Sequence, residues 1–234
     1  MILLAGGRGS RMGSDIPKQY MEVAGKPLLW YCLNAVQDSA VIDDCILVCP
    51  ASDNSFIREK ILDKYGFDKV ISVAPAGSER WESVRNGLKV LDEICCGCES
   101  GSSGGKHYVF IQDSARIFLN EDIITGCLDG VRKYGAVLAA VPCKDTIKIV
   151  DEESAICDTP PRSRVWLAQT PQVFERKLIT ECYDKADSSF EITDDAGVVE
   201  LFSDHKVYPV MGDYQNIKVT TPEDIAVCER FLDR

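Results

Sequence analysis

The start of the chain combines a glycine-rich segment with two well-spaced cations. Residues 4–13 read LAGGRGSRMG, and PKQY follows at residues 17–20. Glycines let backbone N–H groups approach a ligand without interference from side chains, and Arg11 and Lys18 supply the fixed positive charge that polyphosphate chemistry requires. We expect the backbone of this cradle to come from Ala5, Gly6, Gly7 and Gly9. The segment therefore predicts a binding site for a nucleoside triphosphate.

Two commoner phosphate-binding loops do not fit this segment. A Walker loop ends in Gly-Lys-Ser or Gly-Lys-Thr, and the chain contains no such triplet. A dinucleotide fingerprint that starts at Gly7 would need a glycine at its sixth position, where Met12 stands. The plainer alternative is a glycine-rich turn whose two cations are merely solvated, and the rest of the chain must decide between the two.

A carboxylate and another cation follow an apolar run later in the chain. Asp113, Ser114 and Arg116 come directly after the strand-like segment 108–111. Oxygen ligands suit Mg²⁺, a hard cation that bridges them to phosphates, so Asp113 is the candidate metal ligand, beside a nucleotide contact at Ser114. Arg116 could bind the phosphate of a second substrate through paired hydrogen bonds. A local salt bridge between Asp113 and Arg116 is the alternative.

A third polar segment joins a predicted strand to a predicted helix. Residues 76–84 read AGSERWESV. The N–H groups and hydroxyls of Gly77, Ser78 and Ser83 could hold a base or a ribose at the N-terminus of that helix. The structural alternative is capping of the helix by Ser78, with Glu79 in its first turn.

Three further segments carry polar residues that structure could explain. Residues 166–174, WLAQTPQVF, are expected to be half core, and Thr193-Asp194-Asp195 is a good helix N-cap. Residues 216–224, NIKVTTPED, are expected to end a strand and to start a helix with proline at its first position. Within this last segment, Lys218 alone has no structural explanation.

Apolar runs that read as strands alternate with helix-period segments. The predicted strands are 2–5, 44–48, 70–74, 108–111 and 207–211. Helical spacing places three sets of apolar residues each on one face of a helix: Phe56, Ile57, Ile61 and Tyr65; Val84, Leu88, Leu91 and Cys95; and Ile225, Cys228 and Leu232. Alternation of this kind is typical of an α/β fold, in which helices cover both faces of a mainly parallel sheet and the ligand lies off the carboxyl ends of the strands.

A projecting arm is predicted over residues of about 144–166. Segments 145–150 and 154–158 read as a hairpin around 151–153, and a proline-arginine stretch with Arg162 and Arg164 leads back, after which the chain is expected to return to helix. The plain interpretation of the charged residues is a solvated arm surface. Because such an arm has little core of its own, we expect a partner subunit to cover it in a homodimer.

Composition bounds the class of protein. The 234 residues, 45% of them hydrophobic, suffice for a single α/β domain over residues 1–234. The net charge of -11 argues against a surface for nucleic acid or an anionic membrane, because phosphate groups demand a basic face. Neither a membrane span nor a signal peptide is expected, since no apolar stretch reaches about 18 residues and the chain opens on a strand.

The eleven cysteines are mostly scattered through apolar positions. Free cysteine in such positions behaves as a small hydrophobic residue, so a reducing, cytoplasmic location is the simpler inference. Cys95, Cys96 and Cys98 are clustered beside a predicted flexible loop at 98–105, but the second ligand pair of a zinc site is missing.

Taken in order, these segments resemble the 2-C-methyl-D-erythritol 4-phosphate cytidylyltransferase family of the non-mevalonate isoprenoid pathway. The resemblance runs from Leu4 to Asp224 through six blocks: LAGGRGSRMG with PKQY, GSERWESV, QDSAR, VPCKDTIK, WLAQTPQVF with TDD, and NIKVTTPED. It implies a Rossmann-like nucleotide-diphospho-sugar transferase fold with a dimerising arm. It also implies transfer of CMP from CTP to methylerythritol phosphate, with Mg²⁺ as cofactor and pyrophosphate as leaving group.

The resemblance also implies roles for individual residues. Arg11 and Lys18 match residues that stabilise charge on the CTP phosphates, Asp113 matches the position near the magnesium ion, and Gly77, Ser78 and Ser83 match the cytidine-binding segment. The positions that match contacts to the polyol phosphate are Arg116, Thr146, Arg162, Thr170, Thr193 and Lys218, those on the arm reaching a neighbouring subunit's site. The catalytic residues expected on this basis are Arg11, Lys18, Arg162 and Lys218.

Departures from the family pattern keep alternatives open. The family usually has a second alanine where Gly6 stands, and HDAARP where Gln112, Ser114 and Ile117 replace a histidine, an alanine and the proline. Ala-Gly-Gly and Asp-Ser also occur in sister enzymes that make CDP-ribitol, whereas the TDD and DTIK blocks resemble the methylerythritol enzymes. Methylerythritol phosphate is therefore the favoured acceptor, ribitol 5-phosphate is the alternative, and an inactive nucleotide-binding regulator is the second alternative.

Overall fold

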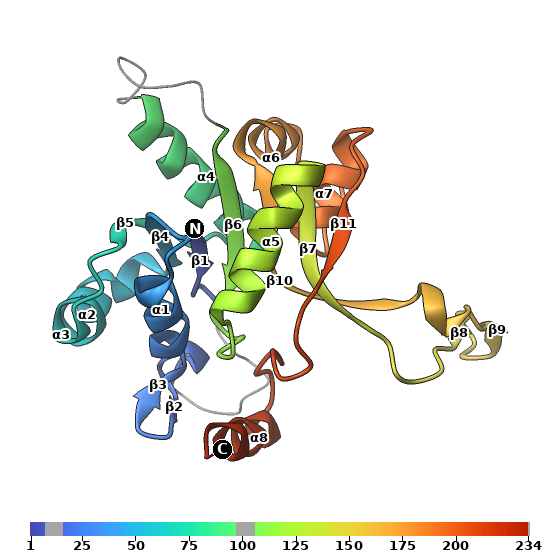
Figure 1. The fold of residues 1–234 in the computed structure, drawn as a ribbon, viewed down its shortest axis with the longest axis horizontal. Coiled ribbons are helices and arrows are strands. Elements are labelled where there is room, and N and C mark those ends of the chain that lie inside the picture. The colour runs from blue at the N-terminus through green and yellow to red at the C-terminus, as the bar shows by residue number, and fades with distance from the viewer. Residues whose placement is uncertain (8–15, 97–105, 234) are drawn as a thin grey trace.

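The computed structural model describes residues 1–7, 16–96 and 106–233. Within them the chain forms a seven-stranded sheet in the order β11-β7-β10-β6-β1-β4-β5 (Figure 1). Its strands are β1 (Ile2–Leu4), β4 (Cys45–Cys49), β5 (Val70–Pro75), β6 (Tyr108–Asp113), β7 (Ala136–Pro142), β10 (Trp166–Glu175) and β11 (Tyr208–Met211). Neighbouring strands are parallel except at β10, which runs antiparallel to β6 and β7. The expected α/β fold with a mainly parallel sheet is confirmed.

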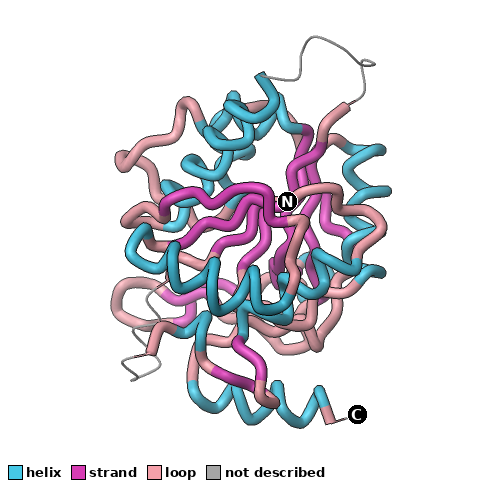
Figure 2. Tube along the Cα trace, turned by 90° about the vertical axis from the view of Figure 1, so that its left-hand side faces the viewer, coloured by secondary structure: helices cyan, strands magenta, loops and turns pink. Residues whose placement is uncertain are grey.

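Helices lie on both sides of the strands (Figure 2). They are α1 (Leu28–Asp38), α2 (Asn54–Ile57), which continues through a π-helical turn at Arg58–Leu62 into α3 (Asp63–Tyr65), α4 (Arg80–Cys96), α5 (Glu121–Tyr134), α6 (Arg176–Tyr183), α7 (Asp195–Phe202) and α8 (Pro222–Leu232). Successive side chains of a strand point to opposite faces. Along β1, Leu3 therefore packs in the core beneath α1 and α5, whereas Ile2 and Leu4 pack in the core beneath α4 and α6.

Local signals set where the helices near the carboxyl edge of the sheet begin and end. The Asn120 side chain accepts a hydrogen bond from the N–H of Ile123 at 3.0 Å and caps α5, which ends at Gly135 in the left-handed conformation. Helix α8 starts as predicted, with Pro222 in its first turn and a capping box between Thr221 and Asp224.

The predicted arm projects from the body of the molecule (Figure 1). Two short strands, β8 (Ile149–Val150) and β9 (Ile156–Asp158), pair antiparallel across the turn that the sequence indicated. They are shorter than predicted, because residues 145–148 form no strand. The arm then returns through a 3-10 turn at Arg162–Arg164 into β10.

The segment after the arm differs from the prediction. The expected return to helix comes at α6 and α7, but the chain first forms the ten-residue strand β10 over residues 166–175, which was not predicted. The strand is hard to recognise because polar residues occupy its buried stretch: Gln169, Thr170 and Gln172 are 6% exposed or less. The register also shifts between Ala168 and Gln172, which breaks the period-2 pattern. The expectation that half of the segment is core is confirmed.

Two smaller expectations also need correction. Phe56 does not share the buried face of Ile57 and Ile61: it is exposed and its ring packs on the edge of Tyr20, with 5.0 Å between centroids. Residues 216–219 precede α8 without forming a strand. The loop predicted at 98–105 lies wholly outside the described residues. No helix in the described part of the chain is both long and apolar enough to cross a membrane.

Candidate active site

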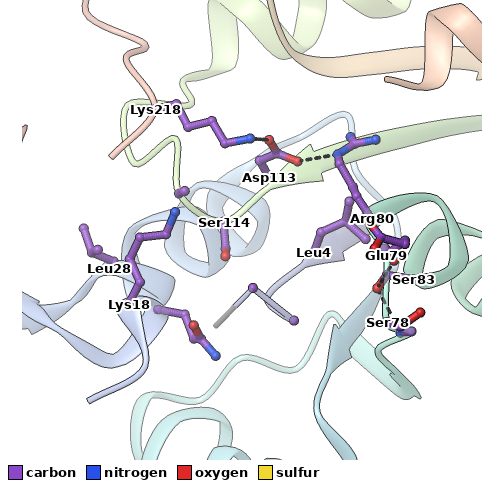
Figure 3. A pocket seen from close by; sticks show the side chains of 15 residues that line it. Leu4, Lys18, Leu28, Ser78, Glu79, Arg80, Ser83, Asp113, Ser114 and Lys218 are labelled. Atoms are coloured by element: carbon purple, nitrogen blue, oxygen red, sulfur yellow. Dashed lines mark hydrogen bonds and ion pairs between the residues drawn. The ribbon is translucent and has the colours of Figure 1, made fainter. Parts of the chain in front are cut away.

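A cavity of about 540 Å³ opens where the carboxyl ends of β1 and β6 meet the turn between β5 and α4 (Figure 3). The register explains the meeting, since Leu4 at the end of β1 lies beside Asp113 at the end of β6. The predicted residues that line this cavity are Gly6, Gly7, Lys18, Gly77, Ser78, Ser83, Asp113, Ser114 and Lys218. The described parts of the glycine-rich segment, the AGSERWESV segment and the carboxylate segment therefore share one site.

Asp113 lies at the centre of the polar groups in this cavity. Its Oδ1 accepts a hydrogen bond from Arg80 Nε at 3.2 Å, and its Oδ2 accepts one from Lys218 Nζ at 2.7 Å. The two cations reach it from opposite sides (Figure 3). Asp113 thus pairs with Arg80 and Lys218, and the alternative of a local salt bridge to Arg116 is wrong.

The charges around Asp113 keep it ionised. Burial alone would raise the pKa of this carboxyl, but the positive charges of Arg80 and Lys218 outweigh burial and hold the pKa well below its usual range. Behind the carboxylate, the backbone N–H of Asp113 donates to Thr170 Oγ1 at 3.2 Å. Thr170 is buried, so in this structure it orients the end of β6.

The side chains of this cavity fit a magnesium ion that is held mostly by the phosphate groups of a bound substrate and by water. No cluster of three or more His, Cys, Asp or Glu side chains that could hold a metal is present among the described residues. Mg²⁺ is commonly bound through one or two carboxylates, with substrate phosphates and water completing its shell. Asp113 is an ionised carboxylate that lines the cavity together with Lys18 and Lys218, so it suits this mode of binding.

Lys18 and Lys218 approach the cavity from adjacent segments. Lys18 begins a short 3-10 helix, Lys18–Tyr20, and its Nζ donates to the carbonyl of Val219 at 2.8 Å. This contact places the first cation next to the loop that carries the second. Arg11 and Gly9 lie outside the described residues.

The glycine turn after β1 packs closely against the end of β5. The N–H of Ala5 donates to the carbonyl of Val48 at 2.7 Å, and Ala5 is buried rather than exposed to the cavity. A Cβ on Gly6 would lie 2.5 Å from Cβ of Ala76, whereas one on Gly7 would meet nothing within 4 Å. Gly6 is thus required by close packing.

The turn before α4 is held by the first turn of its own helix. Glu82 Oε2 accepts hydrogen bonds from the N–H and the hydroxyl of Ser78 at 2.7 and 2.6 Å, and the Ser83 hydroxyl accepts one from the N–H of Gly77 at 3.0 Å. The structural alternative that Ser78 is the N-cap is wrong, because α4 begins at Arg80, two residues later, and the Ser78 hydroxyl donates to Glu82. A side chain at Gly77 would collide with Glu82, with 2.3 Å between Cβ atoms. The turn is thereby preformed beside the cavity.

Several residues expected to contact the polyol phosphate lie away from this cavity. Arg116 directs its guanidinium to the carbonyls of Asn216 and Ala168, at 2.7 and 3.1 Å. Thr146 and Arg162 are exposed on the arm, where Arg162 donates to the carbonyl of Lys144 at 2.9 Å. Thr193 is exposed just before α7. Within one chain, only Lys218 of this set lines the cavity.

Three residues behind Asp113 had no separate role in the sequence-based prediction. Arg80 donates from Nη1 and Nη2 to the two oxygens of Asp195, at 2.9 and 2.7 Å, and Tyr183 donates its hydroxyl to Asp195 Oδ1 at 2.6 Å. Asp194 caps α7 as predicted, by accepting from the N–H of Gly197. The capping pattern concealed the role of Asp195, and the signal in the sequence was a second aspartate directly after the cap.

Comparison with known proteins identifies close similarity over the whole chain. A model of the 2-C-methyl-D-erythritol 4-phosphate cytidylyltransferase family matches residues 1–234. Proteins of that name are similar to it: one from Caldanaerobacter subterraneus subsp. tengcongensis is 39% identical over 99% of this chain and 97% of its own, and one from Lachnospira eligens is 40% identical over 99% and 97%. The crystal structure of 4-diphosphocytidyl-2C-methyl-D-erythritol synthase from Anaerococcus prevotii is 36% identical and superimposes with a TM-score of 0.82, covering 100% of this chain and 95% of the other.

Proposed function

Because the chain belongs to the 2-C-methyl-D-erythritol 4-phosphate cytidylyltransferase family, and is thus a cytidylyltransferase of the non-mevalonate isoprenoid pathway, we propose that the cavity around Asp113 is where it performs this reaction. The observation that carries the proposal is the convergence of Lys18, Lys218, Asp113 and the Gly6–Gly7 turn on one cavity. Family membership also favours methylerythritol phosphate over ribitol 5-phosphate, and an enzyme over an inactive regulator.

The reaction is a direct displacement at phosphorus. A phosphate oxygen of the acceptor forms a bond to the α-phosphorus of CTP, the bond from that phosphorus to the bridging oxygen breaks, and pyrophosphate leaves with the electron pair. A phosphate monoester is already anionic near neutral pH, so no general base is needed. Catalysis then depends on positioning and on neutralisation of the charge on the triphosphate.

Each residue of the cavity has a proposed place in this scheme. Lys18, with Arg11, neutralises the triphosphate, while the preformed turn at Gly77–Ser83 receives the nucleoside. Asp113 would hold Mg²⁺ together with phosphate oxygens of CTP, and the ion would supply further charge neutralisation when bound. Lys218 attracts the acceptor's phosphate.

We propose that the remaining contacts come from a second subunit. Thr146 and Arg162 are exposed on an arm that projects from its own body, together with the exposed apolar side chains of Ile149, Val150 and Ile156. A homodimer in which each arm packs on the partner would cover these apolar groups and bring the two polar residues toward the other cavity.

A reducing cytoplasm is the proposed location, because it suits the seven buried thiols among the described cysteines.

Substitution of Lys18 and Asp113 tests the proposed site. Lys18→Met and Asp113→Asn should each fold and lower kcat for pyrophosphate release from CTP and methylerythritol phosphate by about 10²–10³-fold, because each removes a charge that acts on the reacting phosphates. Lys89→Met, which removes an exposed lysine of α4, is the matched control. Turnover near that of the unmodified enzyme in Lys18→Met or Asp113→Asn would refute the assignment.

A further inference from the structure

A chain of hydrogen-bonded groups runs from the cavity into the protein interior. It leads from Lys218 through Asp113, Arg80 and Asp195 to Tyr183, with successive donor–acceptor distances of 2.7, 3.2, 2.7 and 2.6 Å. Asp195 is fully buried and receives three hydrogen bonds, two from Arg80 and one from Tyr183. The inner part of this chain is therefore rigidly paired and shielded from solvent.

The two cations on Asp113 differ in how firmly they are held. Arg80 is the first residue of α4, and its guanidinium forms a paired contact with Asp195, the first residue of α7. Lys218 comes from a loop between β11 and α8, and its side chain is 40% exposed. Lys218 can thus exchange its partner at little cost, whereas Arg80 cannot move without leaving Asp195 as a buried, unpaired charge.

Helix stability does not explain Arg80. A cation in the first turn of a helix opposes the helix dipole, so this position disfavours arginine unless something else requires it. Nor is a buried ion pair by itself a strong source of stability, since neutral replacements of similar volume often fold as well. The contact that remains to be explained is the one that Arg80 makes with Asp113 at the wall of the cavity.

We propose that Arg80 is a positioning residue for the transfer reaction: anchored on Asp195, it holds Oδ1 of Asp113 so that Lys218 can leave Oδ2 for a substrate phosphate while the carboxylate keeps its orientation. This inference rests on the proposed function, in which Asp113 and Lys218 act on the substrates. Without Arg80, departure of Lys218 would free the carboxylate to rotate, and Asp113 would compete with the substrate phosphate for the Lys218 ammonium.

A double substitution separates positioning from simple support of the fold. Arg80→Gln combined with Asp195→Asn removes both charges together, so no buried charge is left unpaired and the protein should fold. We expect kcat to fall by about 10- to 100-fold, the range typical of residues that orient a ligand-binding group. The KM for methylerythritol phosphate should rise as well, because Lys218 stays on Asp113. Titration calorimetry should also show weaker binding of CTP in the presence of Mg²⁺.

A second ion pair of the same type provides the matched control. Arg176 of α6 and Asp92 of α4 lie 3.4 Å apart, with partly exposed side chains, and neither lines the active-site cavity. Arg176→Gln with Asp92→Asn should leave kcat, KM and CTP binding unchanged. If the Arg80 and Asp195 double variant does not fold, Arg80→Lys replaces it: this side chain keeps the charge beside Asp195 but cannot bridge both carboxylates, so kcat should again fall at least about 10-fold.

The outcomes separate this inference from the proposed function. Wild-type kcat in the folded double variant, or in folded Arg80→Lys, overturns the positioning role of Arg80. Asp113→Asn is measured alongside: if it retains full turnover, the proposed function itself fails, whatever the Arg80 variants do. Loss of turnover in Asp113→Asn together with full turnover in the double variant would overturn the positioning role alone.

Discussion

Gly6 and Ala76 face each other where the glycine-rich turn passes the end of β5. The family that the loop resembles usually has alanine at the position of Gly6. Here a Cβ at that position would lie 2.5 Å from Cβ of Ala76, which sits directly on the backbone and cannot rotate away. Glycine at position 6 therefore lets the backbone of the turn pass close to Ala76 beside the cavity.

This pairing predicts a rescue. Gly6→Ala should reduce the free energy of unfolding by about 1–3 kcal/mol, the usual cost of overpacking, and should raise the KM for CTP by displacing the turn. Ala76→Gly in the same chain removes the colliding atom and should restore most of the loss. Urea unfolding of both single variants and the double variant gives the coupling energy. Equal stability of Gly6→Ala and the unmodified protein would contradict the close contact.

At the scale of elements, the arm is the part of the molecule that its own chain explains least. Strands β8 and β9 have two and three residues, and an isolated hairpin of this size is at best marginally stable in water. Its apolar residues Ile149, Val150 and Ile156 are 47–64% exposed. The proposed homodimer supplies the missing partner surface.

A charge on the arm should therefore dissociate the dimer. Ile156→Glu places a carboxylate in the proposed contact, and light scattering should then show a monomer at concentrations where the unmodified protein is a dimer. Activity should fall together with dimerisation, because Thr146 and Arg162 would no longer reach a second cavity. Leu201→Glu, at another exposed apolar position on α7, is the control that should remain dimeric. A dimeric Ile156→Glu protein would exclude this part of the arm from the interface.

At the scale of the whole molecule, buried thiols are spread through the cores. Seven described cysteines are buried: Cys32, Cys45, Cys49, Cys127, Cys143, Cys182 and Cys228. Burial raises the pKa of Cys32 and of Cys127 to about 12, and the pKa of Cys45, Cys49 and Cys228 to about 11. These thiols stay protonated in the folded protein well above the pH at which an unfolded chain loses its thiol protons, about 8.5.

This difference predicts a steep loss of stability in alkali. Above pH of about 8.5 the unfolded chain releases thiol protons that the folded protein retains, so the free energy of unfolding should decrease as the pH rises toward 11–12. Each such thiol contributes a slope of about 1.4 kcal/mol per pH unit. Denaturant titrations between pH 7 and 10.5 should show a shallower slope for Cys127→Ala, while Cys157→Ala, which replaces an exposed thiol, should leave it unchanged. An unaltered slope in Cys127→Ala would contradict this account.

Much of the fold could be predicted from the sequence, and strand β10 shows why part of it could not. The apolar runs that became β1, β4, β5 and β6 are short and continuous, and buried parallel strands have that pattern. Strand β10 escaped recognition because Gln169, Thr170 and Gln172 are buried and satisfied by partners that come from elsewhere in the chain, such as Asp194 and Asp213. Polar residues that are paired at long range look like surface residues in a sequence.

By itself the sequence determined where most of the strands and helices form and which polar segments follow them, since periodicity and turn chemistry act over a few residues. It therefore brought out Lys18, Asp113 and Lys218 one by one, each in its own segment. Only the tertiary structure decided that Arg80 at the start of α4 would join Asp113 to Asp195 and Tyr183. Charges taken out of water must find partners wherever folding brings them together, and no spacing along the chain records that choice.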